Sequence, residues 1–121
     1  MLYKELSEEI IECCLEVIKE LGSGFLESVY EKALIVTLIQ KGLKVRSQVP
    51  LQVRFRGEIV GEFFADIVVN DKIIVELKAV RALLPEHQAQ VINYLKATGI
   101  DVGLLVNFGT PKLEIKRLYR Q

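Results

Sequence analysis

The sequence contains no tryptophan, one histidine, one methionine, three prolines and two cysteines among its 121 residues. A structural zinc site takes four Cys or His side chains, so this supply makes such a site improbable. Cys13 and Cys14 are neighbours in a predicted helix, where adjacent side chains point in different directions. We therefore expect no disulfide between them and interpret both as thiols in or near the core.

The chain also lacks an excess of either charge and any long apolar run. Lys and Arg number 16, Asp and Glu number 16, and the formal net charge is zero. A protein that coats DNA without specificity is usually basic, so binding by bulk charge is disfavoured, whereas a small basic patch beside an active site is not. The apolar runs are too short to span a bilayer, and the N-terminus lacks the apolar core of a signal peptide. We expect no membrane association and a cytoplasmic location.

Half of the residues are hydrophobic and 26% are charged, which is typical of a soluble globular protein. The length suits one domain over residues 1–121. Apolar spacing predicts two helices, one following a Ser7 cap and ending near residue 21, and one over 26–41. Strands are predicted over 43–49, where Pro50 ends the first, and over 51–56, 59–69 and 72–80. A helix over 85–98, a buried strand over 102–108 and an edge strand over 113–119 complete the order. This order predicts an α/β sandwich with a mixed sheet, in which the last helix joins two parallel strands.

Three charged residues, Asp66, Glu76 and Lys78, lie inside the apolar strands 59–69 and 72–80. Charged side chains are rarely buried unless they are paired or functional. Glu76 and Lys78 share one face of their strand because side chains alternate. A two-residue loop between the strands would direct Asp66 to the wrong face, whereas a loop over 70–72 pairs Val69 with Ile73 and sets Asp66 beside Glu76. We predict the longer loop, because it also gives one fully apolar face.

In that register, Asp66 and Glu76 offer oxygen ligands to a hard cation such as Mg²⁺. Such a cation lowers the pKa of water and offsets the charge of a phosphate, and Lys78 is placed to act on the same phosphate. The alternative is a surface ion pair on a half-exposed strand, because a D…ExK pattern is short and common by chance. These three residues alone do not decide between metal-assisted hydrolysis and a surface ion pair, so other segments of the sequence must be considered.

Two helical segments supply further motifs. In GFLESVY, residues 24–30, Glu27 and Tyr30 are three apart and share a helix face. In EHQAQVINYL, residues 86–95, a stripe of polar-capable side chains could hold a phosphate, a base edge or the catalytic lysine; it consists of His87, Gln90 and Tyr94. Taken alone, each segment has an ordinary structural interpretation, as a helix start and as a solvated helix face.

With these residues in view, the chain resembles the GxxExxY family, a branch of the PD-(D/E)xK nuclease superfamily, over nearly its whole length. Residues 24–30 match the motif that gives the family its name, and Asp66 with the triplet 76–78 resembles the superfamily core. Gln90 and Tyr94 resemble the QxxxY element of several exonuclease branches. The resemblance implies a restriction-endonuclease-like fold, a mixed sheet flanked by helices with the core order αβββαβ, which agrees with the predicted order.

The resemblance also implies metal-dependent cleavage of a phosphodiester bond. Asp66 and Glu76 would be ligands of Mg²⁺ or Mn²⁺, and Lys78 the catalytic lysine. The supporting roles would fall to Glu27 as a further acid and possible metal ligand, and to Gln90 and Tyr94 as catalytic partners of the lysine or the substrate.

Substrate contact is expected from local groups, because the chain has no overall charge. We assign this role to Tyr30, His87, Arg54 and Arg56. The leading interpretation is a nuclease acting on nucleic acid, with DNA expected, although the sequence separates neither DNA from RNA nor exonuclease from endonuclease. The alternatives are a catalytically inactive module that binds nucleic acid or protein on the same fold, and a hydrolase of small phosphorylated molecules. A homodimer is expected if one domain offers too little surface.

Overall fold

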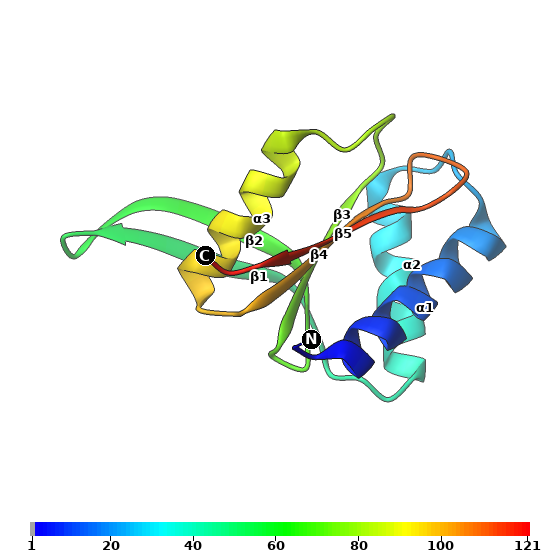
Figure 1. The fold of residues 1–121 in the computed structure, drawn as a ribbon, viewed down its shortest axis with the longest axis horizontal. Helices are drawn as coiled ribbons and strands as arrows, with labels where there is room; N and C mark the ends of the chain where they lie inside the picture. The colour runs from blue at the N-terminus through cyan, green and yellow to red at the C-terminus, as the bar shows by residue number, and fades with distance from the viewer. Residues whose placement is uncertain (1) are drawn as a thin grey trace.

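The computed structural model describes residues 2–121 and contains three helices and five strands within that range (Figure 1). The elements in chain order are α1 (Lys4–Leu21), α2 (Glu27–Gln40), β1 (Val45–Phe55), β2 (Glu58–Val69), β3 (Ile73–Lys78), α3 (Pro85–Thr98), β4 (Val102–Asn107) and β5 (Glu114–Tyr119). The predicted order is confirmed except that the strands predicted over 43–49 and 51–56 form the single strand β1. The third helix has the predicted bounds, with Gly99 ending it in the left-handed conformation. Within the described part of the chain, no helix is long and apolar enough to cross a bilayer.

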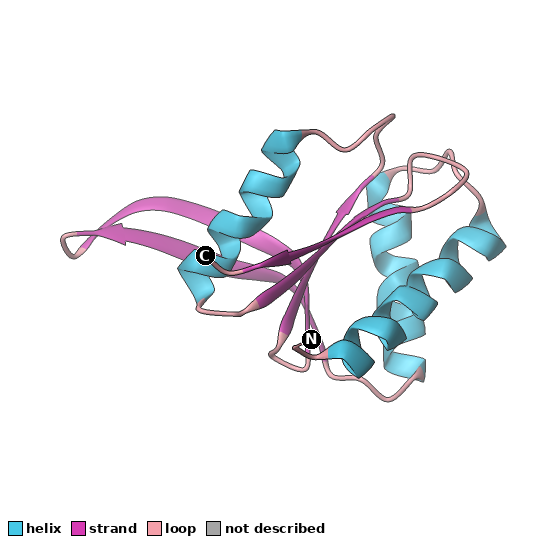
Figure 2. Ribbon diagram, viewed as in Figure 1, coloured by secondary structure: helices cyan, strands magenta, loops and turns pink. Residues whose placement is uncertain are grey.

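The five strands form one mixed sheet in the order β1-β2-β3-β4-β5. All neighbours are antiparallel except β3 and β4, which are parallel and joined through α3. Helices α1 and α2 cover one face of the sheet, and α3 covers the other (Figure 2). The predicted α/β sandwich with a mixed sheet is confirmed.

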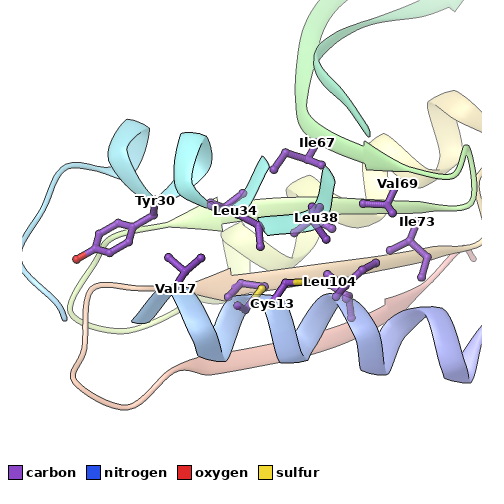
Figure 3. Packing of buried hydrophobic residues seen from close by; sticks show 14 of the residues in the cluster. Cys13, Val17, Tyr30, Leu34, Leu38, Ile67, Val69, Ile73 and Leu104 are labelled. Carbon is purple, nitrogen blue, oxygen red and sulfur yellow. The ribbon is translucent and has the colours of Figure 1, made fainter. Parts of the chain in front are cut away.

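Two hydrophobic clusters hold these layers together. The larger one lies between the sheet and the pair α1–α2, where Leu34 and Leu38 meet Ile67, Ile73 and other buried strand residues (Figure 3). The smaller cluster lies under α3 and includes Leu51, Ala65, Val91 and Leu95. Burial of apolar area on both faces explains why the central strands β3 and β4 have nearly continuous apolar sequences.

The turn between β2 and β3 has the predicted register. Val69 pairs with Ile73 and Ile67 with Val75, so the loop comprises residues 70–72. Asn70 and Asp71 both adopt the left-handed conformation, with φ of 52° and 55°, which Asn and Asp tolerate better than most residues. The carboxylate of Asp71 also accepts bonds from Lys44 and Arg46, which fixes the end of the hairpin.

The hairpin of β1 and β2 extends well beyond its neighbour β3. The ladder with β3 covers only residues 67–69 of β2, whereas β1 pairs with β2 almost along its whole length. The part that does not pair with β3, residues 49–65, extends beyond it as a two-stranded arm, whose base packs under α3 through Leu51 and Ala65 (Figure 1). A cleft therefore forms on the side where α3 faces the arm.

Side-chain alternation breaks where this arm begins. On β1, Val45 packs in the cluster under α1 and α2, but Val49 packs under α3. On β2, Ile67 and Ala65 divide between the same two clusters. Residues separated by an even number of positions normally share a face, so the alternation of side chains must reverse between these residues on each strand. Gln48 makes this change on β1 with φ of 49°, a rare conformation for a residue other than glycine.

Two details of the predicted boundaries were wrong. The first helix starts at Lys4, so Ser7 is a buried residue inside it and not its N-cap. Pro50 does not end a strand, because β1 continues through it and pairs Pro50 with Phe64. Since β1 is an edge strand, the missing N–H of proline can face away from the sheet without breaking a central ladder.

Cys13 and Cys14 are both fully buried free thiols, as predicted for core residues. Burial raises the pKa of both thiols, which leaves little of the reactive thiolate at neutral pH. We predict that Ellman's reagent modifies the native protein very slowly and both thiols at once after unfolding in guanidinium chloride. Rapid stoichiometric modification of the native protein would contradict this packing.

Candidate active site

The carboxylates of Asp66 and Glu76 lie together where β2 and β3 separate. The backbone N–H of Asp66 donates to Glu76 Oε1 at 2.7 Å, and the N–H of Leu77 donates to Asp66 Oδ2 at 2.9 Å. These bonds lie one residue beyond the last backbone pair, Ile67 with Val75. Each carboxylate thus satisfies a backbone donor of the opposite strand, which fixes the two side chains side by side.

Glu76 is the most deeply buried acid at this point, with only 3% of its surface exposed. Burial raises its pKa to about 9, and the negative charge of Asp66 adds to this effect, while the bond from the Asp66 backbone and the charge of Lys78 oppose it. Two adjacent carboxylates cannot both ionise cheaply in such surroundings. A cation bound between them would remove this cost.

Lys78 lies two residues after Glu76 on β3 and is half-buried. Its Nζ donates to Oε1 of Gln90 at 3.2 Å, which connects the strand to α3. Tyr94 follows one helical turn later and is buried under the arm. Burial raises the pKa of its hydroxyl, the charges of Glu76 and Asp66 raise it further, and a hydrogen bond to Gln90 lowers it. Gln90 and Tyr94 therefore lie at the same site as the acids and the lysine.

Helix α2 approaches the site from the opposite layer. Glu27, at the start of α2, is an exposed residue, but neighbouring protein atoms shield its carboxyl group from water and raise its pKa, with a further rise from Asp66 and an opposing effect from Lys78. The charges of Asp66 and Lys78 therefore both act on Glu27. The structure places Glu27 near the predicted acids, and its role as a ligand remains a prediction.

Sequence reasoning missed two residues at this site, Glu31 and Gln48. The Nε2 group of Gln48 donates to Glu31 Oε1 at 2.7 Å and lies 3.4 Å from Asp66 Oδ1. Glu31 lies one helical turn after Glu27, and this spacing was a signal that the motif analysis overlooked. Gln48 gave no signal, because its place opposite Asp66 depends on the pairing of β1 with β2.

Two residues expected to contact substrate have structural roles. Tyr30 is fully buried, its hydroxyl donates to the carbonyl of Gly22 at 2.6 Å, and its ring stacks on Phe108. His87 Nδ1 accepts the N–H of Leu84 at 3.0 Å and so stabilises the start of α3. Burial removes Tyr30 from solvent, so its expected contact with substrate is wrong. The cap uses only Nδ1 of His87, so a substrate contact through Nε2 stays a prediction.

The two arginines differ in their surroundings. Arg54 lies on the arm and borders the cleft of about 820 Å³ whose lining also includes Gln90 and Tyr94. Arg56 lies at the turn of the arm, where its guanidinium stacks 4.9 Å from the centre of the Phe55 ring. Only Arg54 therefore shares a surface with the residues around Lys78.

The donor atoms suit a hard divalent cation. Among residues 2–121, no three acidic, histidine or cysteine side chains converge as a ready metal cage. Mg²⁺ does not require one, since it is usually held by one or two carboxylates together with substrate phosphates and water. Asp66 and Glu76 provide such a pair, and the raised pKa of Glu76 indicates that a cation beside it would stabilise its ionised form.

Comparisons with known proteins identify the family and the fold. A family model described as PD-(D/E)XK nuclease superfamily matches residues 4–118. Among solved structures, the protein SSO0001 aligns with a TM-score of 0.64 at 18% identity over 77% of this chain. An alkaline exonuclease from Laribacter hongkongensis aligns with a TM-score of 0.57 at 14% identity over 100% of this chain and 72% of its own. This chain spans about half of SSO0001, 49% of its length. At such identities the two structures establish the fold, and comparison with curated proteins gave no match.

Proposed function

The chain belongs to the PD-(D/E)XK nuclease superfamily, and on that premise we propose that it is an active nuclease that uses Mg²⁺ or Mn²⁺ to hydrolyse phosphodiester bonds in DNA. Within the superfamily, the motif formed by Gly24, Glu27 and Tyr30 supports the GxxExxY branch. The observation that carries the proposal is the reciprocal pair of bonds that fixes the Asp66 and Glu76 carboxylates side by side, two residues from Lys78.

Asp66 and Glu76 would hold the metal ion, with Glu27 as a further acid on the α2 side. A bound Mg²⁺ supplies positive charge against the phosphate and makes water more acidic. In the hydrolysis, water attacks phosphorus, one P–O ester bond breaks, and the departing sugar oxygen takes up a proton. Lys78 stabilises the negative charge that develops on the phosphate, because its ammonium group is held by Gln90 at this site and its charge acts on Glu76.

A substrate panel tests this proposal. The purified protein is incubated with labelled single-stranded DNA, duplex DNA and RNA of one sequence, in Mg²⁺, in Mn²⁺ and in EDTA. We expect cleavage of DNA in either metal and none in EDTA. Cleavage that persists undiminished in EDTA would contradict the role of the metal, and faster cleavage of RNA would contradict the assignment of DNA.

Gln90 is expected to act by positioning Lys78. Replacing Gln90 with alanine removes the acceptor 3.2 Å from Nζ and leaves the ammonium group free to rotate. We predict a fall in kcat of roughly 10-fold with little change in KM, and partial recovery with Gln90→Glu, which restores an acceptor. Gln88→Ala on the same helix is the matched control, and an equal loss in that variant would assign the effect to the helix as a whole.

A further inference from the structure

The cleft between the arm and α3 shares Gln90 and Tyr94 with the site described above, but the rest of its lining has no role in the proposed chemistry. Its volume is about 820 Å³, within the range of ligand-binding cavities. One wall is the arm, from which Gln52, Arg54 and Phe63 contribute. The other wall is one face of α3, which contributes Gln90, Asn93, Tyr94 and Lys96.

Aromatic rings form the centre of this cleft. The centroids of Phe63 and Tyr94 are 5.8 Å apart with the ring planes inclined at 44°, so the two rings are not stacked flat on each other. Phe63 remains 44% exposed although the cleft surrounds it. Gly61 makes space for the ring, since a Cβ atom there would lie 3.0 Å from it. A flat group of similar size can therefore lie against Phe63.

The polar groups of the cleft have a distinct pattern. The lining includes two cations, Arg54 and Lys96, and one acid, Glu86, which gives a net positive wall in a chain without net charge. Gln52 and Asn93 add side-chain amides. The oxygen of Gln52 accepts from Arg54 at 3.2 Å, which leaves its NH2 group to donate to the edge of a nucleobase, whereas the amide of Asn93 can donate and accept. Positive charge, an exposed ring and amides are the combination used to bind unpaired nucleotides.

We propose that this cleft binds single-stranded nucleic acid next to the carboxylate site, with one base stacked on Phe63 and a phosphate beside Arg54. This inference rests on the proposed nuclease function and names the form of its substrate. The cleft is continuous with the catalytic residues, because Gln90 lines it and also holds Lys78. A strand lying in the cleft is thereby led to the lysine.

The dimensions favour a single strand over a duplex. A volume of about 820 Å³ is that of a cavity for a small ligand, whereas the bases of a duplex are enclosed in the stack and do not enter a pocket unless they are extruded. Stacking on Phe63 requires a base that is free of its neighbours. Duplex DNA should therefore bind through its frayed or unpaired ends.

Binding is measured in EDTA, without turnover, by fluorescence anisotropy with labelled oligo-dT, oligo-rU and a blunt duplex. We expect either single strand to bind at least 10-fold more tightly than the duplex. The comparison of oligo-dT with oligo-rU shows whether the cleft prefers DNA or RNA. Replacing Phe63 with alanine should weaken binding on the order of 10-fold, and Arg54→Gln should weaken it and reduce its salt dependence. A ring retained as Phe63→Tyr should restore binding if Phe63→Ala is poorly folded.

The chain offers matched controls for both variants. Phe64 is next in sequence and 57% exposed but does not line the cleft, and Arg46 on β1 is exposed, pairs with Asp71 and does not line it either. Phe64→Ala and Arg46→Gln should leave the affinity unchanged. Equal affinity for duplex and single strand, or equal losses in variants and controls, would overturn the proposal.

Two further results separate this proposal from others. A dimer seen by sedimentation velocity that Phe63→Ala dissolves would overturn it by assigning the cleft to a second copy. Selective single-strand binding with no cleavage in Mg²⁺ or Mn²⁺ would support the cleft and refute the nuclease function. Cleavage of a single strand at a rate that Phe63→Ala leaves unchanged would support the nuclease function and overturn the proposed role of the cleft.

Discussion

Replacing Lys78 with alanine is expected to lower the cleavage rate in Mg²⁺ by roughly 100- to 1000-fold, the usual loss when a group that stabilises transition-state charge is removed. Lys78 is the basic residue of β3 that extends toward α3 and meets Gln90. Its ammonium group also opposes the charges of Glu76 and Glu27, so no neutral side chain can replace its effect. The rate is followed in single turnover with a labelled oligonucleotide.

The control for this variant is Lys72→Ala. Lys72 precedes the opposite end of β3, is exposed, and lies 5.6 Å from the centre of the Tyr3 ring. The Lys72→Ala variant should retain the full rate, because the rate depends on the ammonium group at position 78 and not on the total positive charge of the protein. Undiminished cleavage by Lys78→Ala would refute the mechanism, whatever the behaviour of the control.

Replacing Glu76 with glutamine is expected to abolish metal-dependent cleavage and to make the metal-free protein more stable at pH 8. The amide keeps the size of the carboxyl group and removes the negative charge that metal binding requires. At the same time the amide needs no proton, whereas Glu76, with a pKa of about 9 in the folded protein, must take one up when the chain folds at pH 8. Loss of activity together with a gain in stability is typical of a functional group held in unfavourable surroundings.

The sign of the pH dependence follows from this pKa. Between about pH 5 and pH 9 the folded protein keeps a proton on Glu76 that the unfolded chain releases, so stability falls as the pH rises. One proton limits this fall to about 1.4 kcal/mol per pH unit. Urea unfolding in EDTA at pH 6 and pH 8 should show the fall in the wild type and a much smaller one in Glu76→Gln.

Glu62→Gln on the exposed arm is the control, and it should keep the dependence of the wild type. Adding Mg²⁺ at pH 8 should stabilise the wild type and this control but not Glu76→Gln. A steeper fall in stability with pH in Glu76→Gln than in the wild type would contradict the burial of charge at this position.

The register of the β2–β3 hairpin was predictable because one choice alone kept Val69, Ile67, Ile73 and their neighbours on a single apolar face. That choice also placed Asp66 beside Glu76, so the centre of the site followed from hydrophobic patterning. The helix α3 was equally accessible, since Pro85 and Gly99 mark its two ends.

The surroundings of the site were not predictable in the same way. Gln48 contacts Glu31 and approaches Asp66 only because β1 breaks its alternation where the arm leaves the sheet. The cleft depends on the distance between the arm and α3, which no periodicity encodes. Tyr30 was misassigned for a related reason: a polar hydroxyl on a helix suggests a surface role, whereas its ring fills the core against Phe108.

The central claim is that Asp66 and Glu76 hold one divalent cation, and crystals soaked in Mn²⁺ test it most directly. Anomalous scattering at the manganese edge should give a single peak within ligand distance of both carboxylates, and the peak should be missing in crystals of Glu76→Gln. A peak bound elsewhere on the protein, with none between these two side chains at saturating Mn²⁺, would contradict the account.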